Sequence, residues 1–336
     1  QPPPSRVTID KSATTRAGIQ SADGDPCFNV SGTIARANKL PYAVPVNDVP
    51  PRPVPRYRGE YRDQLGSAVP VRNVVVELRE EDTVSDDSYG HTVTGDLGRF
   101  TFNFCDGDGA LDDELELYFR VCAEVRAGSS LIAQVREWDS RNLYCWDSPV
   151  LESGGGDVDF DLQSYDINST QAKVFNIAEA VYWAWRFWNA NATQSPAFDR
   201  SVTVWWQDGR GEDGSYYSDD STAMVIADDP SNRDEWDDSV IIHEWGHFAD
   251  HQFSCNQGPG GEHKLPGMNN GYAGQRLAWS EGYPDYYQSA ARSIMSNTDS
   301  VRFFVDPDGP TVDLENMSGV TASERDEGAI AAMLWD

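Results

Sequence analysis

Two histidines, His243 and His247, stand four residues apart in the segment DDSVIIHEWGHFADHQF, which spans residues 237–253. The apolar periodicity of this segment predicts a helix. Residues four apart on a helix lie on one face, one turn from each other, so both imidazoles can bind the same metal ion. Zinc accepts neutral imidazole nitrogen and favours a tetrahedral set of ligands. The pair therefore predicts a zinc site.

Glu244 follows the first histidine and lies about 100° further around the helix. It cannot easily bind the same ion there, but it can reach a water molecule that the ion holds. Zinc lowers the pKa of such a water towards roughly 7. Glu244 can then take its proton and pass it to a leaving amine, so we expect it to act as a catalytic base. We expect Gly246 to leave room beside the metal.

A catalytic zinc site needs a third protein ligand as well as an open position. In HExxHxxGxxH proteins a third histidine supplies it, but Asp250 and Phe253 occupy the Gly and His positions here. His251 rotates off the metal-binding face. The strongest candidate is Glu281, in the apolar helix predicted over 276–295. The full set of candidates is Asp250, His251, Glu262, His263 and Glu281.

The order HExxH followed by a later helix with E-x-x-x-D resembles the gluzincin metallopeptidases, the thermolysin-like clan. The resemblance covers roughly residues 165–336 and includes the segment WSEGYPDYY. It implies that Glu281 is the third zinc ligand and that Asp285 orients His243. The 33 residues between His247 and Glu281 exceed the spacing in thermolysin itself. The resemblance is therefore to the clan and not to that one family.

Gluzincins also use a Tyr or a His to stabilise the negatively charged oxygen that forms during the reaction. The resemblance makes Tyr283 and Tyr286 candidates for this role, with Tyr287 and His263 nearby. The sequence does not select among them.

The surrounding elements predict an α+β zincin-like catalytic domain over residues 165–336. Strands are predicted at 201–207 and 221–227, and helices at 170–189, 237–253, 276–295 and 323–335. Asp237, Asp238 or Ser239 can cap the helix predicted over 237–253, and Ser323 can cap the last helix. Pro284 should bend its helix or mark the first turn. The last helix ends one residue before Asp336, so we expect the natural domain to continue.

The first half predicts a different architecture, an antiparallel β-sandwich accessory domain over residues 25–164, preceded by a polar tail at 1–24. Short β-branched and aromatic runs alternate there with Gly, Asp and Pro clusters. A Pro-rich insertion, 41–55, separates the first two runs, and 157–163 reads as a closing strand. The Val30-Ser31-Gly32 run and the later residues Thr94, Asp96, Gly98, Phe100 and Phe102 resemble the transthyretin-like or carboxypeptidase-regulatory-like sandwich. The fold class is thus multidomain.

The charge balance excludes some partners. Acidic residues number 55 against 26 Lys and Arg, for a net charge of −29. Nucleic-acid binding requires a basic face, so it is not expected. Since the chain has no run of 18 apolar residues, membrane insertion is not expected either. The expected partner is a protein or peptide substrate.

The five cysteines include no CxxC pair, which disfavours a cysteine zinc site. Two disulfides among Cys27, Cys105, Cys122 and Cys145 are expected if the protein is exported, with Cys255 left over. The chain begins at Gln1 without Met, which is typical of a processed, secreted protein.

Asp106, Asp108 and Asp112 place carboxylates in a Gly-rich segment. They fit either a calcium site or a solvated acidic loop. A second acidic segment, with Asp228, Asp229, Asp234 and Glu235, has the same two interpretations.

These features together predict a secreted zinc metallopeptidase that cleaves within protein chains. One alternative is an exopeptidase or a glycoprotein-directed peptidase whose sandwich helps to recognise substrate. Another is a non-catalytic adhesion or carbohydrate-binding protein with a zincin-like domain. The intact Glu244 argues against the last, because a decayed site commonly loses its base.

Overall fold

The computed structural model describes residues 27–47, 56–63, 68–82, 85–105, 115–153, 156–192, 199–211, 214–254, 258–261, 263–265, 269, 274–295, 301–307, 311–316 and 320–336. Several predicted features lie outside these ranges, namely the tail at 1–24, the calcium candidates Asp106, Asp108 and Asp112, and also Glu262 and Cys255.

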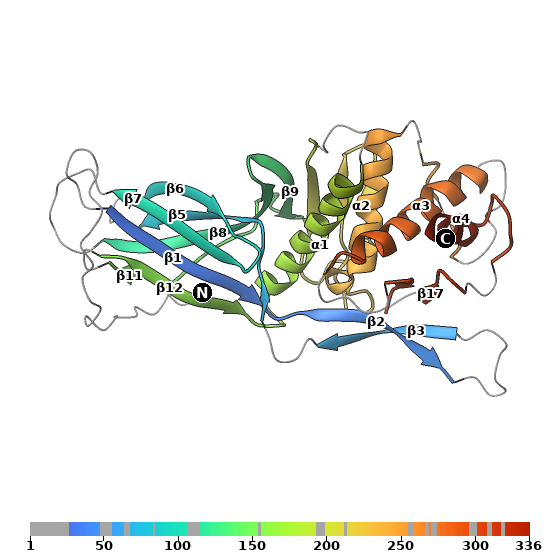
Figure 1. Cartoon of the computed structure of the whole chain (residues 1–336), viewed down its shortest axis with the longest axis horizontal. Coiled ribbons are helices and arrows are strands. Elements are labelled where there is room, and N and C mark those ends of the chain that lie inside the picture. The colour runs from blue at the N-terminus through green and yellow to red at the C-terminus, as the bar shows by residue number, and fades with distance from the viewer. Residues whose placement is uncertain are drawn as a thin grey trace.

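Two large sheets form the β-rich part of the described structure (Figure 1). In the first, β1 lies between β12 on one side and β7 and β4 on the other. Its strands are β1 (Cys27–Arg36), β4 (Val69–Pro70), β7 (Arg99–Cys105) and β12 (Val158–Tyr165). The second has the order β14-β15-β13-β9-β8-β5-β6, with β10 and β11 also paired to β8. Its strands are β5 (Val74–Glu80), β6 (Asp87–Val93), β8 (Glu116–Ala127), β9 (Ser130–Glu137), β10 (Cys145–Asp147), β11 (Leu151–Glu152), β13 (Val202–Trp206), β14 (Tyr216–Ser218) and β15 (Ala223–Val225).

The two sheets pack face to face, as the sandwich prediction requires. The ring of Phe119 on β8 contacts Phe100 on β7 and Phe160 on β12, with centroid distances of 4.9 and 5.1 Å. The strand expected near 157–163 is present as β12, but it runs parallel to β1. The prediction of a purely antiparallel sandwich was therefore wrong. Since β12 lies far from β1 in sequence, no tight turn forces the two strands to be antiparallel.

The second sheet continues into the second half of the chain. β13 pairs in parallel with β9, where Val204 faces Val135, and with β15, where Val204 faces Met224. A single cluster of buried apolar residues also extends from the sandwich strands to the helices. The second sheet and the main core thus include residues from both sides of the boundary that we predicted between residues 164 and 165.

The helix predicted at 170–189 is present as α1 (Thr170–Asn191). The Ser169 hydroxyl accepts a hydrogen bond from the Ala172 N–H and caps the helix. Most of α1 is buried all round, because it packs against β8 and β9 on one side and against α2 and α3 on the other. It therefore connects the sheet to the helices that carry the candidate site.

Three further α-helices of the described residues follow the predicted order, namely α2 (Asp238–Phe253), α3 (Gly274–Arg292) and α4 (Glu327–Trp335). A short 3-10 helix, η1 (Asp234–Trp236), precedes α2. Because α3 extends on both sides of Pro284, the proline does not mark its first turn. The last helix begins later than predicted, and Asp326, not Ser323, caps it by accepting from the Ala329 N–H.

The Pro-rich insertion and the residues that flank it contain structure that we did not predict. β2 (Lys39–Val46) and β3 (Arg56–Asp63) form a two-stranded ribbon, which we call the arm. Figure 1 shows the arm extending from the sandwich towards the helices. Among the described residues each of its strands pairs along one edge alone, and prolines such as Pro41 and Pro45 are tolerated in such edge strands. A second ribbon, β16 (Phe303–Val305) and β17 (Thr311–Asp313), packs against the arm.

One predicted disulfide joins Cys122 on β8 to Cys145 on β10, which are partners in the same antiparallel ladder. Cys27 is also disulfide-bonded, and its backbone partner across the β1–β7 ladder is Cys105. None of the described helices is long and apolar enough to cross a membrane.

Candidate metal centre

The helix that carries the two histidines is anchored at its start and along one side. The Asp237 carboxylate accepts hydrogen bonds from the N–H groups of Ser239 and Val240, at 2.8 and 3.3 Å, and so caps α2. At 100° per residue, the fully buried apolar side chains lie opposite the histidines. These side chains are Ile241, Ile242, Trp245, Phe248 and Ala249. Burial of this side directs His243 and His247 towards α3.

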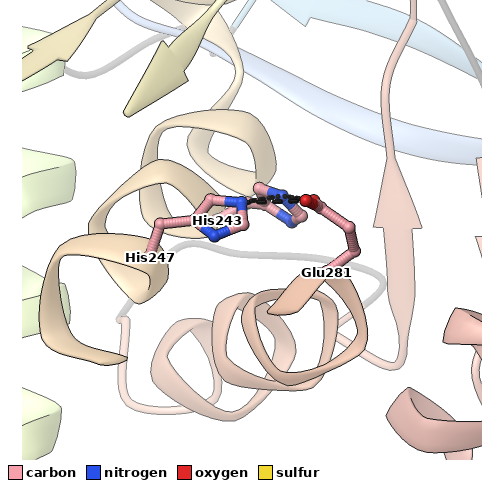
Figure 2. Close-up of side chains that lie close together, drawn as sticks. All are labelled: His243, His247 and Glu281. Carbon is pink, nitrogen blue, oxygen red and sulfur yellow. Dashed lines mark hydrogen bonds and ion pairs between the residues drawn. The ribbon is translucent and has the colours of Figure 1, made fainter. Parts of the chain in front are cut away.

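Three side chains from two helices converge on one point (Figure 2). The Nε2 atoms of His243 and His247 lie 3.1 Å apart. One carboxylate oxygen of Glu281, Oε2, lies 3.4 Å from Nε2 of His243 and 3.2 Å from Nε2 of His247. Among the described residues, these are the three His and Glu side chains whose donor atoms group closely enough to hold a metal.

The spacing of the three donors can be compared with the needs of a zinc ion. Bonds of about 2.0–2.1 Å in a tetrahedron place neighbouring ligand atoms about 3.3–3.4 Å apart. The observed separations of 3.1, 3.2 and 3.4 Å are close to this value. Two imidazole nitrogens and one carboxylate oxygen are also a donor set that zinc accepts. The site therefore fits zinc with three protein ligands and one further position.

Close helix packing places Glu281 opposite the histidines. A Cβ atom at Gly246 would lie only 3.0 Å from the Cα and Cβ atoms of Pro284, so glycine lets α2 and α3 approach. On the far side of α3, a Cβ at Gly282 would lie 2.6 Å from the Glu327 carbonyl oxygen of α4. The space at Gly246, which we expected beside the metal, is thus used for the contact with Pro284.

A carboxylate next to Nδ1, the ring nitrogen that does not face the other donors, orients His243. Its Nδ1 lies 3.0 Å from Oδ1 of Asp285, one turn after Glu281 on α3. Burial alone would lower the pKa of His243, but the interactions with Asp285 and Glu281 outweigh it and raise the pKa well above its usual value. Likewise, burial would raise the pKa of Glu281, but the two histidines lower it strongly. The cluster is thus a strongly coupled set of charges.

A third histidine approaches from the other side of the site. Nε2 of His263 lies 3.8 Å from Oε2 of Glu281. Its Nδ1 lies 3.1 Å from Oε2 of Glu327, a fully buried residue at the start of α4. This contact with Glu327, opposed by burial, raises the pKa of His263 to about 9. His263 thus has the same carboxylate-to-Nδ1 arrangement as His243, and its side chain is 43% exposed.

Sequence reasoning considered His263 but missed Glu327. Glu327 lies 64 residues further along the chain, and no regular spacing relates the two. Only the packing of α4 against α3 brings them together.

Glu244 is buried next to His243, and its charge contributes to the raised pKa of that histidine. Among the described residues, no hydrogen bond to its carboxylate is found. Within the described part of the chain, both oxygens can therefore accept a hydrogen bond from a further molecule.

Tyr283 and Tyr286 lie elsewhere on α3. At 100° per residue they are about 200° and 140° around the helix from Glu281. Their rings are 6.5 Å apart, and Tyr283 also packs 5.8 Å from the ring of Tyr287 at the edge of the main core. Their positions on the helix therefore direct both side chains away from the face that carries Glu281.

His251, another candidate ligand, also points away from the three donors. Its Nδ1 lies 2.6 Å from the hydroxyl of Tyr217 on β14 and 3.7 Å from Oδ1 of Asp219. It therefore packs against the edge strand of the large sheet.

Comparison with known proteins gives one family match. The model of the mycolysin C-terminal domain matches residues 186–336, a range that contains both histidines and Glu281. The match supports a secreted, gluzincin-type protease context. No curated protein matches the chain. Among solved structures, a 9R-lipoxygenase from Cyanothece PCC8801 is similar over 55% of this chain, with 14% identity and a TM-score of 0.23. The chain spans 27% of the length of that lipoxygenase, and so weak a likeness carries no argument.

Proposed function

We propose that this protein is a secreted zinc peptidase of the gluzincin type that hydrolyses bonds within protein or peptide chains. The observation that carries the proposal is the convergence of His243, His247 and Glu281 at separations that fit tetrahedral zinc. The match of residues 186–336 to a domain of a secreted protease supports it. The disulfide Cys122–Cys145 is consistent with export, because such bonds persist in oxidising compartments.

In this proposal the three donors hold zinc, and Asp285 keeps the His243 imidazole in the orientation that presents Nε2. A bound zinc ion would polarise the substrate carbonyl and lower the pKa of a water molecule to roughly 7.

Glu244 is the proposed base. It lies on the same helix as the two histidines, its carboxylate has free accepting capacity, and it is buried beside the donors. It takes a proton from the attacking water and returns it to the nitrogen of the leaving amine.

His263 is the proposed hydrogen-bond donor to the oxygen that becomes negatively charged. Glu327 accepts from Nδ1 and holds the ring, so that Nε2 faces the site. With its pKa raised to about 9, the imidazole is protonated at neutral pH and can donate from Nε2. Its Nε2 lies 3.8 Å from Oε2 of Glu281, whereas Tyr283 and Tyr286 extend from other sides of α3, so His263 is better placed for this role.

The decisive test is Glu244→Gln. The variant should bind zinc like the wild type, because Glu244 is not a ligand, but its kcat should fall about 100- to 10,000-fold. Zinc content is measured by elemental analysis after gel filtration, and hydrolysis with an unstructured protein substrate. Equal activity in the two proteins would refute the mechanism.

A matched control uses the histidines of one helix. His247→Ala should lose zinc, whereas His251→Ala should keep both zinc and activity, since His251 contacts Tyr217 and not the donors.

The cleavage pattern separates the competing functions. Mass spectrometry of the products should show internal cuts. Removal of terminal residues alone would favour an exopeptidase. Tight zinc binding with no hydrolysis of any peptide in a library would favour a non-catalytic adhesion protein.

A further inference from the structure

The arm presents one face of β3 to the helical half of the molecule. Alternate residues of a strand point to the same side, so Tyr57, Gly59 and Tyr61 share a face. The other face carries Arg58 and Glu60, which pair with each other at 2.5 Å, and the Arg58 side chain is 67% exposed. The sequence of β3 therefore alternates between residues for close contact and charged residues for solvent.

Each residue of the inner face has a partner in the second half. The Tyr57 ring packs edge-on against Phe303 of β16, with centroids 4.7 Å apart. A Cβ at Gly59 would lie 2.6 Å from the backbone of Pro307, just after β16. The contact at Gly59 therefore requires the backbone of β3 to lie directly against the backbone of the segment after β16.

The third contact of the inner face reaches the segment before α2. The Tyr61 hydroxyl donates to the carbonyl oxygen of Arg233 at 2.8 Å, and the Arg233 guanidinium lies 4.8 Å from the Tyr61 ring centre. The arm therefore touches both segments that flank the candidate metal centre.

β16 connects the arm to the metal centre. Phe303 faces Tyr57, and the next residue, Phe304, packs its ring 5.8 Å from the imidazole of His243. The buried guanidinium of Arg292 on α3 donates to the carbonyl oxygen of Phe303 at 2.9 Å. Asp285 holds His243 at Nδ1, and Phe304 supports the ring from the side.

The β16–β17 ribbon cannot hold this position alone. It has only three residues in each strand, and an isolated two-stranded ribbon is marginal in water. Its position must come from its neighbours, which are α2, α3 and the arm.

We propose that Tyr57 is a positioning residue of the metal centre. Its ring holds β16 through Phe303, so that Phe304 supports His243 in the orientation that zinc requires. The inference rests on the proposed function of the site, and it makes the N-terminal half of the chain part of the scaffold of the metal centre. Under this proposal the geometry of the metal centre depends on the arm, which is therefore more than an accessory element.

The test replaces Tyr57 by Ala, Leu and Phe in the full chain. Phe keeps the ring edge, so zinc affinity and the absorption spectrum of the cobalt-substituted protein should match the wild type. Leu keeps an apolar side chain but loses the ring, and Ala leaves a gap that β16 can enter. Both should bind zinc more weakly, by about tenfold for Ala, and should change the cobalt spectrum, which reports the geometry of the ligands.

Arg58→Ala is the matched control, because it lies on the same strand but on the exposed face. It should leave zinc affinity within twofold of the wild type. If the Ala variant does not fold, the comparison of Leu with Phe decides.

Two negative results are distinguishable. If the wild type binds zinc but Tyr57→Leu and Tyr57→Ala match it in zinc affinity and cobalt spectrum, the role of the arm is refuted and the proposed function stands. If the wild type itself binds no zinc, the proposed function fails and this inference fails with it.

Discussion

Replacing Asp285 by Asn tests how the second helix supports the metal centre. Asp285 is 1% exposed, and its Oδ1 lies 3.0 Å from Nδ1 of His243. Apart from this contact, no hydrogen bond to either of its carboxylate oxygens is found among the described residues. His243 is therefore the group that senses the change. The amide oxygen of Asn can still accept from Nδ1–H, but the negative charge is lost.

The size of the effect follows from this geometry. Residues that hydrogen-bond to a metal-binding histidine typically contribute 10- to 100-fold to metal affinity. That factor corresponds to about 1.4–2.8 kcal/mol of binding free energy. Because Asn retains the acceptor and the shape of Asp, the lower half of this range is expected. The kcat should also fall, since a misoriented His243 displaces the ion from Glu244.

The pH dependence has a definite sign. In the zinc-free protein Asp285 helps to raise the pKa of His243. A proton on His243 competes with zinc, and the wild type binds this proton more tightly than Asp285→Asn does. The affinity deficit of Asp285→Asn should therefore be largest at high pH and should narrow as the pH falls.

Competition titration against a chelator at several pH values measures these affinities. Ser289→Ala is a suitable control, because Ser289 is fully buried on the same helix but has no contact with His243. It should alter stability and leave zinc affinity unchanged. A zinc affinity of Asp285→Asn within twofold of the wild type at high pH would refute the assigned role of Asp285.

Three further predictions concern neighbouring residues. His263→Phe should retain zinc but lower kcat about 100-fold or more, as removal of an oxyanion donor does. Glu327→Gln should also lower kcat. If kcat is unchanged in both variants, neither residue takes part in the mechanism. Burial, reinforced by the charge of Asp228, raises the pKa of Glu235 from its ordinary value of 4.5 to about 8. Between these two pH values Glu235 is protonated in the folded protein and ionised in the unfolded chain. The stability of the wild type therefore falls as the pH rises from 4.5 to about 8. The melting temperature of Glu235→Gln minus that of the wild type should increase from pH 5 to pH 8.5. If this difference in melting temperature stays constant, the raised pKa of Glu235 is contradicted. Gly282→Val should destabilise the fold by about 2 kcal/mol or more in chemical unfolding, since the new Cβ would lie 2.6 Å from the Glu327 carbonyl oxygen; a neutral result would show that α4 can move away freely.

Local spacing made much of the metal centre predictable from the sequence. The four-residue spacing of His243 and His247, and of Glu281 and Asp285, places each pair on one helical face whatever the surrounding fold. Glu281 was preferred among the candidates for its place in an apolar helix and for the resemblance to gluzincins, and the structure places its carboxylate 3.2 Å from Nε2 of His247. The helix containing the two histidines was also predictable, because its apolar residues recur with the helical period.

Contacts between distant segments were beyond the sequence. The pairing of β13 with β9 links strands from the two predicted domains in one sheet. Nothing in the sequence of either strand indicates which strand it pairs with. The strands of the arm were not predicted, because prolines in a segment argue against a strand unless it lies at the edge of a sheet.

The sequence alone determined which groups can bind a metal and take up a proton, since helical periodicity is a local property of the chain. Only the tertiary structure decided which carboxylates hold which histidines, Asp285 for His243 and Glu327 for His263. It also decided that Tyr57 of the arm reaches β16 beside the site. These choices depend on how closely the backbones approach at Gly246, Gly282 and Gly59, and such distances are set by the packing of whole elements.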